Sequence, residues 1–131
     1  GLPAQAGTDD AYERALLVLS EYPSARANFH FFTGGIATAQ AIVAAGYTLS
    51  VDGPITFSRD YDEMLKSVPL ESIMVETDAP FAAPVPHRGK TCEPWMVSEV
   101  AKKLADIRGE DPEAVRTQLL QNSRKFFNLH F

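Results

Sequence analysis

The stretch SIMVETDAP, residues 72–80, decides the fold. Residues 72–77 are rich in apolar and β-prone side chains and predict a short buried strand. Two carboxylates, Glu76 and Asp78, stand at its carboxyl end, where ligands bind in parallel α/β folds. A proline-rich loop over residues 79–93 follows, and loops of this length are usually functional or disordered. The stretch therefore predicts a parallel α/β fold with a candidate site at the end of this strand.

Strand and helix patterns alternate outward from this stretch. Further strands are predicted at residues 27–32 and 47–51, and a weaker pattern covers residues 2–7, which are rich in poor β-formers. The predicted helices cover residues 9–22, 36–45, 60–67, 94–107 and 112–125. Short connections between alternating elements favour parallel strands joined by right-handed crossovers. The pattern fits either half of an eight-unit barrel or a small open α/β sheet.

The composition limits the class of protein. The chain has 131 residues, of which 45% are hydrophobic and 22% are charged, and this is typical of one globular domain over residues 1–131. The net charge of −5 argues against a protein that coats nucleic acid, although it allows an enzyme with a small basic patch. Charged residues interrupt every apolar stretch, so no membrane span is predicted. The single cysteine, Cys92, cannot form an internal disulfide, which favours a cytoplasmic location.

Three groups of polar residues are candidates for chemistry. Asp78 can bind a metal or act as a general base at the strand end, or it can cap the loop by accepting backbone N–H groups. His30 stands among phenylalanines, which alone favours a core histidine, but its position at a strand end before a glycine turn favours a metal ligand. Residues 86–90, PHRGK, suit phosphate recognition, although a solvated charged loop has the same composition. Trp95 is expected to pack the helix over residues 94–107 against its neighbours.

Several segments together resemble one family. Residues 29–34, FHFFTG, resemble the HCFTG motif of TatD-type metal-dependent hydrolases, and residues 75–80, VETDAP, resemble their ETD-x-P motif. Residues 83–94 resemble their APVPHRGK…EP loop, and residues 122–127 resemble their closing N-x-x-x-L/F-F segment. Each piece alone is weak, but the joint match is specific and covers nearly the whole chain.

The resemblance implies an α/β fold that is the C-terminal half of a TIM-type (β/α)8 barrel, with parallel strands and alternating helices. It also implies a deoxyribonuclease that cleaves DNA phosphodiester bonds with a divalent metal, Mg²⁺, Mn²⁺ or Zn²⁺. His30 on the sixth strand and Asp78 at the end of the eighth would bind the metal, or Asp78 would serve as the base for the attacking water. Glu76 would support the site from close by. The substrate phosphate would lie near the basic residues of the loop, His87, Arg88 and Lys90.

Part of the family's metal site has no counterpart in this sequence. The family has an H-x-H pair on its first strand and a glutamate ligand on a middle strand, and both are absent. Gly7 and Asp9 stand where the family segment LP-x-x-x-H-S/T-R has its histidine and arginine. At most His30 and Asp78 remain, and two ligands are too few for a tight divalent site. Because the chain begins with Gly1 rather than methionine, we expect a fragment or a processed chain.

These features leave three functions open. The chain could be part of a TatD-type nuclease, a non-catalytic half-barrel that folds without nuclease activity, or a metal-dependent hydrolase of a small phosphoester or amide. We expect the family function to be that of the hydrolase and the 131 residues by themselves to be inactive. Metal binding by the chain itself discriminates between the first two functions. A half-barrel would also leave open sheet edges and an apolar face. Self-association, or pairing with a separate N-terminal half, is therefore expected.

Overall fold

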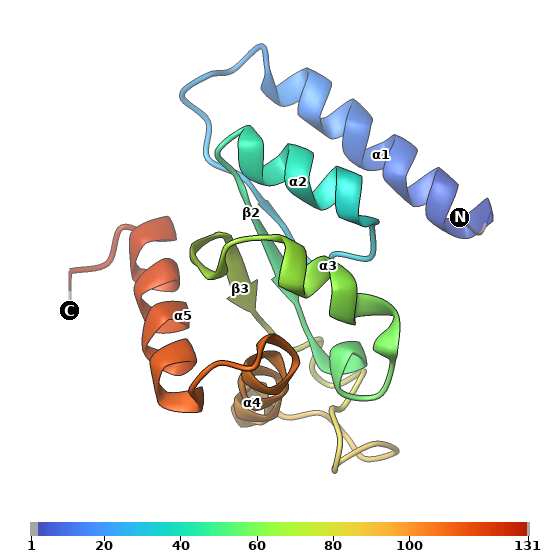
Figure 1. Ribbon diagram of the computed structural model, residues 1–131, viewed down its shortest axis with the longest axis vertical. Coiled ribbons are helices and arrows are strands. Elements are labelled where there is room, and N and C mark those ends of the chain that lie inside the picture. The colour runs from blue at the N-terminus through green and yellow to red at the C-terminus, as the bar shows by residue number, and fades with distance from the viewer. Residues whose placement is uncertain (1–2, 131) are drawn as a thin grey trace.

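The computed structural model describes residues 3–130, and it describes side chains from residue 10 onward. Figure 1 shows a small sheet bordered by helices, with α1 and α5 at opposite borders of the molecule. The helices are α1 (Pro3–Leu19), α2 (Ile36–Ala44), α3 (Asp62–Ser67), α4 (Val97–Arg108) and α5 (Pro112–Phe126). The strands are β1 (Asn28–Phe29), β2 (Thr48–Val51) and β3 (Ile73–Val75). Short 3-10 turns are η1 (Gly53–Thr56), η2 (Arg59–Tyr61), η3 (Leu70–Ser72) and η4 (Pro94–Met96).

The sheet has the order β1-β2-β3, and both strand pairs are parallel. Asn28 pairs with Thr48 at one end of the β1–β2 ladder, and Leu49 pairs with Ile73 in the β2–β3 ladder. Helix α2 connects the first pair and α3 connects the second, as parallel neighbours require a crossover (Figure 1). The predicted alternation of parallel strands and helices is therefore confirmed.

Side chains alternate between the two faces of this sheet. Leu49, Val51 and Ile73 are fully buried in the main hydrophobic core beside residues of α2, α3 and α4. The other face is polar where β1 meets β2, because the Asn28 amide donates to Thr48 Oγ1 (2.8 Å) and accepts from Ser50 Oγ (2.8 Å). The expectation of an apolar face away from the helices is therefore wrong at this position.

Two helical side chains fix the segment that leads into β3. Arg108 of α4 donates to the carbonyls of Leu65 (2.6 Å) and Val68 (2.7 Å). The buried amide of Asn122 in α5 donates to the carbonyls of Leu70 (2.9 Å) and Ile73 (2.8 Å). Since buried carbonyls are costly to leave unpaired, these bonds hold β3 in place against both helices.

The amino-terminal prediction of a strand at residues 2–7 is wrong for the described residues 3–7, which begin helix α1. Their alanines favour a helix over a strand. Residue 2 lies outside the described part. The helix ends at Leu19 rather than at residue 22, because Pro23 disfavours a helical conformation in the residue before it.

The first strand is shorter than the predicted 27–32. Phe31 has a φ of 48°, a left-handed conformation that interrupts a strand. The chain then returns to the sheet, because the Phe32 N–H donates to the Ser50 carbonyl (2.8 Å). The strand therefore ends at Phe29, before His30, and the chain turns at Phe31.

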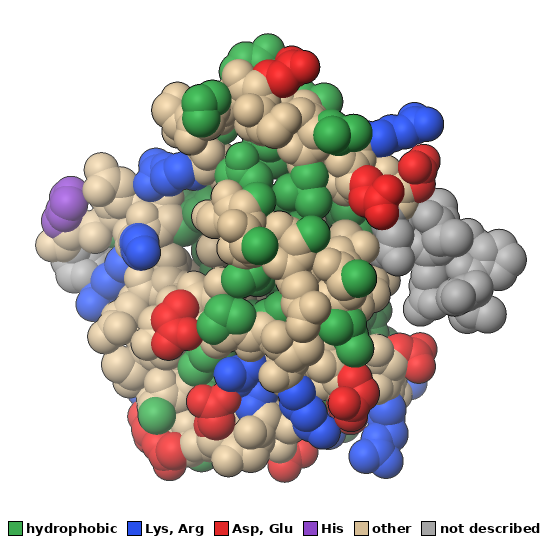
Figure 2. All heavy atoms as spheres, turned by 45° about the horizontal axis from the view of Figure 1, so that its top comes forward, with side chains coloured by type: hydrophobic (Ala, Val, Ile, Leu, Met, Phe, Trp, Pro, Cys, Tyr) green, Lys and Arg blue, Asp and Glu red, His purple; other side chains and the backbone are tan. Residues whose placement is uncertain are grey.

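Apolar side chains also reach the surface. In Figure 2 hydrophobic side chains gather across the middle of one face, and most charged side chains lie around its rim. Leu17, Val18 and Ile36 are among the exposed large hydrophobic residues. Exposed apolar surface favours association, so self-association stays a prediction. No helix within residues 3–130 has both the length and the apolar character that crossing a membrane requires.

Candidate active site at the carboxyl ends of the strands

Each of the three strands ends in a titratable side chain. His30 comes directly after β1, Asp52 directly after β2, and Glu76 directly after β3. Because the strands are parallel, their carboxyl ends lie together at one end of the sheet. Asp78 follows Glu76 by two residues. The fold therefore brings residues from distant parts of the sequence to one end of the sheet.

Glu76 connects the ends of β1 and β3. Its Oε1 atom accepts a hydrogen bond from the Phe31 N–H (2.8 Å) and lies 3.8 Å from His30 Nδ1. The His30 side chain is 83% exposed, so the interpretation as a core histidine is wrong. The left-handed turn at Phe31 aims this N–H at the carboxylate. Glu76 thus holds the segment that presents the imidazole, while the ring itself stays accessible.

Asp78 lies at the surface, at the start of the long loop. The backbone closes the turn, because the Phe81 N–H donates to the Asp78 carbonyl (2.7 Å). Within residues 3–130 no hydrogen bond to the Asp78 carboxylate is found, so the loop-capping interpretation has no support. The carboxylate is free to bind a ligand from solvent.

Asp52 is a candidate that the sequence analysis missed. The residue is 2% exposed, and neither carboxylate oxygen has a hydrogen-bond partner among the described residues. Burial, followed by the charges of Glu76 and Asp78, raises the pKa of Asp52 from 3.8 to about 7. The sequence Asp-Gly-Pro indicates a turn, and the residue was therefore interpreted only as part of that turn. Asp52 also follows an apolar strand, as the Glu76–Asp78 segment does. That shared position is the signal that could have found it.

The loop over residues 79–93 packs against the end of β2. A Cβ atom on Gly53 would lie 2.0 Å from the Ala82 carbonyl oxygen, so only glycine allows this approach. The Val85 N–H donates to Thr56 Oγ1 (2.8 Å), and the Cys92 N–H donates to the Pro80 carbonyl (2.9 Å). The loop is therefore an anchored part of the site.

The basic residues of this loop contact aromatic rings. Arg88 Cζ lies 3.8 Å from the centroid of the Phe57 ring, and the His87 and Trp95 ring centroids are 5.2 Å apart. Lys90 is exposed in the same loop. Trp95 is 55% exposed, so the prediction that it packs the following helix against its neighbours is wrong.

The side chains at this edge suit a divalent metal in kind, since imidazole and carboxylate groups are common ligands. They are too few in number. Across the part of the chain that the structure describes, no three His, Cys, Asp or Glu side chains lie close enough to share one ion. The described residues therefore do not provide a complete set of protein ligands for one ion.

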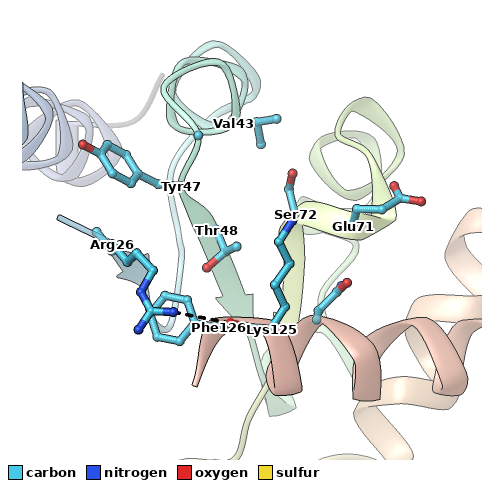
Figure 3. Close-up of a pocket in the computed structure, with 11 residues that line it drawn as sticks. Arg26, Val43, Tyr47, Thr48, Glu71, Ser72, Lys125 and Phe126 are labelled. Atoms are coloured by element: carbon cyan, nitrogen blue, oxygen red, sulfur yellow. Dashed lines mark hydrogen bonds between the residues drawn. The ribbon is translucent and has the colours of Figure 1, made fainter. Parts of the chain in front are cut away.

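A cavity of about 260 Å³ lies at the opposite end of the sheet. Figure 3 shows its lining side chains, which include Arg26, Tyr47, Ser72, Lys125 and Phe126. These residues precede the strands or belong to the end of α5, so the cavity sits at the amino ends of the strands. In parallel barrels that end contributes to stability rather than to chemistry. The candidate site and the cavity are therefore separate features.

Known proteins resemble this chain in sequence and fold. The family described as TatD related DNase matches residues 1–128. YabD of Bacillus subtilis, described as an uncharacterized metal-dependent hydrolase, is 30% identical over 133 residues, covering 98% of this chain and 52% of YabD. The 3'-5' ssDNA/RNA exonuclease TatD of Erwinia billingiae is 33% identical over 129 residues, covering 92% of this chain and 49% of that protein. The crystal structure of YjjV, a TatD homologue from Escherichia coli K12, has a TM-score of 0.81 and 26% identity, covering 91% of this chain and 47% of that one.

The chain thus spans about half the length of the curated relatives it matches. Its parallel sheet and alternating helices superimpose on TatD-type barrels, which confirms the predicted half-barrel fold. The resemblance stated from the four sequence segments is confirmed as well, because the family match extends over nearly every residue. The chain belongs to the TatD-related DNase family.

Proposed function

We propose that this chain supplies part of the active site of a metal-dependent deoxyribonuclease that acts on DNA phosphodiester bonds. One observation carries the proposal. The carboxyl ends of the strands bring His30, Glu76 and Asp78 to one edge, and the loop with Arg88 and Lys90 is anchored there. The naming of the Erwinia billingiae relative as an exonuclease supports a nucleic-acid substrate.

Each residue has a proposed role that follows from its surroundings. His30 and Asp78 are metal ligands, because both side chains are accessible and neutral imidazole and carboxylate bind divalent ions. Glu76 positions His30 through its contacts with the His30 ring and the Phe31 N–H. The exposed cations Arg88 and Lys90 bind the substrate phosphate. A divalent metal would supply a more acidic bound water and positive charge near phosphorus.

Calorimetric titration of the chain with Mn²⁺ and with Zn²⁺ tests the proposal. We expect weak binding, because two ligands are too few for a tight divalent site, and we expect its loss in His30→Ala and in Asp78→Ala. His130→Ala is a matched control, because His130 is also an exposed histidine but lies at the end of the chain. Undiminished metal binding in both site variants contradicts the assigned ligands. Mn²⁺-dependent cleavage of a labelled oligodeoxynucleotide then tests the activity itself.

A second candidate function is a half-barrel module without catalysis. It is favoured by the lack of three converging ligands within the described residues. A folded chain that binds neither metal would support this candidate over the nuclease.

A further inference from the structure

Large aromatic side chains are exposed around the candidate site. Phe57 is 40% exposed, Phe81 is 69% exposed and Trp95 is 55% exposed. They come from three segments, which the loop contacts tie to the carboxyl end of β2. Folded chains seldom leave several aromatic rings near one another in water unless a ligand or partner covers them.

Trp95 combines exposure with a fixed orientation. Its indole N–H donates to Glu93 Oε2 (2.8 Å), and the His87 ring meets it at an interplanar angle of 78°. The only polar group of the side chain is thus already satisfied, while more than half of its surface stays accessible. What remains for a ligand is an apolar aromatic surface that is held in place.

Two exposed cationic side chains belong to the same loop. Arg88 stacks over Phe57, and Lys90 follows it in the same exposed loop, with its N–H bonded to the His87 carbonyl (3.1 Å). The chain as a whole carries a net charge of −5, so this basic segment contrasts with the rest of the surface. Exposed aromatic and cationic groups in one region suit a ligand that carries both flat rings and phosphates, as an unpaired nucleic acid strand does.

We propose that Trp95 is the stacking surface for an unpaired nucleobase of a single-stranded nucleic acid whose phosphates contact Arg88 and Lys90. The inference rests on the function proposed above, because it places a base beside the substrate phosphate that Arg88 and Lys90 are proposed to bind. Under this proposal Trp95 distinguishes a strand that carries bases from one without them, whereas Arg88 and Lys90 contact only phosphates.

Trp95 is the single tryptophan of the chain, so fluorescence excited at wavelengths that tyrosine does not absorb reports on this side chain alone. The experiment compares a thymidine 12-mer with an abasic 12-mer of the same phosphate number, both in EDTA so that nothing is cleaved. We expect the thymidine oligomer to quench the fluorescence and the abasic oligomer to leave it unchanged. Anisotropy of labelled oligomers gives the affinities.

Three variants complete the design. Trp95→Ala should weaken binding of the thymidine oligomer roughly 5- to 150-fold, the loss of one stacked base, without changing the affinity for the abasic oligomer. Trp95→Phe should retain part of the preference because it keeps an aromatic ring. Tyr22→Ala is the matched control, since Tyr22 is an equally exposed aromatic that precedes β1 at the other end of the sheet.

Equal affinity of the natural chain for both oligomers, or equal affinity of Trp95→Ala and the natural chain for the thymidine oligomer, overturns the stacking proposal. The same holds if neither oligomer binds, in which case a protein partner is the better explanation of the exposed ring. Metal calorimetry and hydrolysis of bis(4-nitrophenyl) phosphate, which has no nucleobase, report on the proposed nuclease separately. A chain that passes those tests without base preference loses only the stacking proposal.

Discussion

Replacing Asp52 with asparagine should stabilise the metal-free protein at alkaline pH. The carboxyl group is buried, lacks hydrogen-bond partners among the described residues, and lies near the charges of Glu76 and Asp78. Its pKa is about 7 in the folded chain and 3.8 as its ordinary value, so the folded state holds the proton more tightly. Between about pH 4 and pH 7 the folded state therefore binds more protons than the unfolded state, and the free energy of unfolding falls as the pH rises.

The size of the effect follows from the two pKa values. The two pKa values differ by about 3 units, and each unit corresponds to about 1.4 kcal/mol, so the natural chain loses about 4 kcal/mol of its free energy of unfolding by pH 8. That is a large share of the roughly 5–15 kcal/mol that stabilises a typical domain. Asparagine has nearly the same shape as aspartate and no charge, so the variant does not lose this stability as the pH rises. If the buried amide stays unpaired, the gain at pH 8 is smaller by about 1–3 kcal/mol.

Urea unfolding in EDTA, followed by Trp95 fluorescence at pH 4.5 and at pH 8, measures the effect. The variant and the natural chain should differ little at the lower pH, and the variant should unfold at a higher urea concentration at pH 8. Asp60→Asn controls for the loss of an exposed carboxylate. If Asp52→Asn and the natural chain have the same pH dependence, the reasoning about burial and neighbouring charge is refuted.

Three further predictions follow from other contacts. Gly53→Ala should displace the loop at Ala82 and destabilise the fold by about 1–3 kcal/mol, seen as a lower urea midpoint; an unchanged midpoint would contradict the close approach. Asn122→Ala should cost about 1–3 kcal/mol because the carbonyls of Leu70 and Ile73 lose their donor, whereas an exposed substitution in α5 such as Gln121→Ala should cost much less in the same assay. Sedimentation should show dimers or larger species formed through the open sheet edges at β1 and β3, and a monomer at all concentrations would oppose this.

The sequence predicted those elements that are determined by their own residues rather than by distant parts of the chain. The apolar run at residues 73–75 and the carboxylates after it are visible in the sequence, and β3 with Glu76 and Asp78 at its end followed as expected. The glycine turn after His30 likewise marked the end of β1, although the left-handed Phe31 made that strand shorter than its apolar pattern suggested.

Long-range packing decided what the sequence could not predict. Asp52 was hidden in a turn signal, because its burial depends on how other segments pack around β2 rather than on its own neighbours. Trp95 was expected to be packed because tryptophan usually is, but the bond from its indole to Glu93 holds the ring at the surface. The roles of His30 and Asp78 stay predictions, since the side chains that would complete a metal site are not among the described residues.

The hydrogen bonds of Asn28 to Thr48 and Ser50 also have a meaning for protein engineering. Strands this short form few ladder bonds, and slipping by one residue would exchange the polar and apolar faces of the sheet. The amide of Asn28 makes such a slip costly, because it would leave its two hydroxyl partners behind. A designer who transplants this sheet into another scaffold should therefore keep all three side chains together. Their hydrogen bonds fix the register of these short strands, which longer strands fix through more backbone hydrogen bonds.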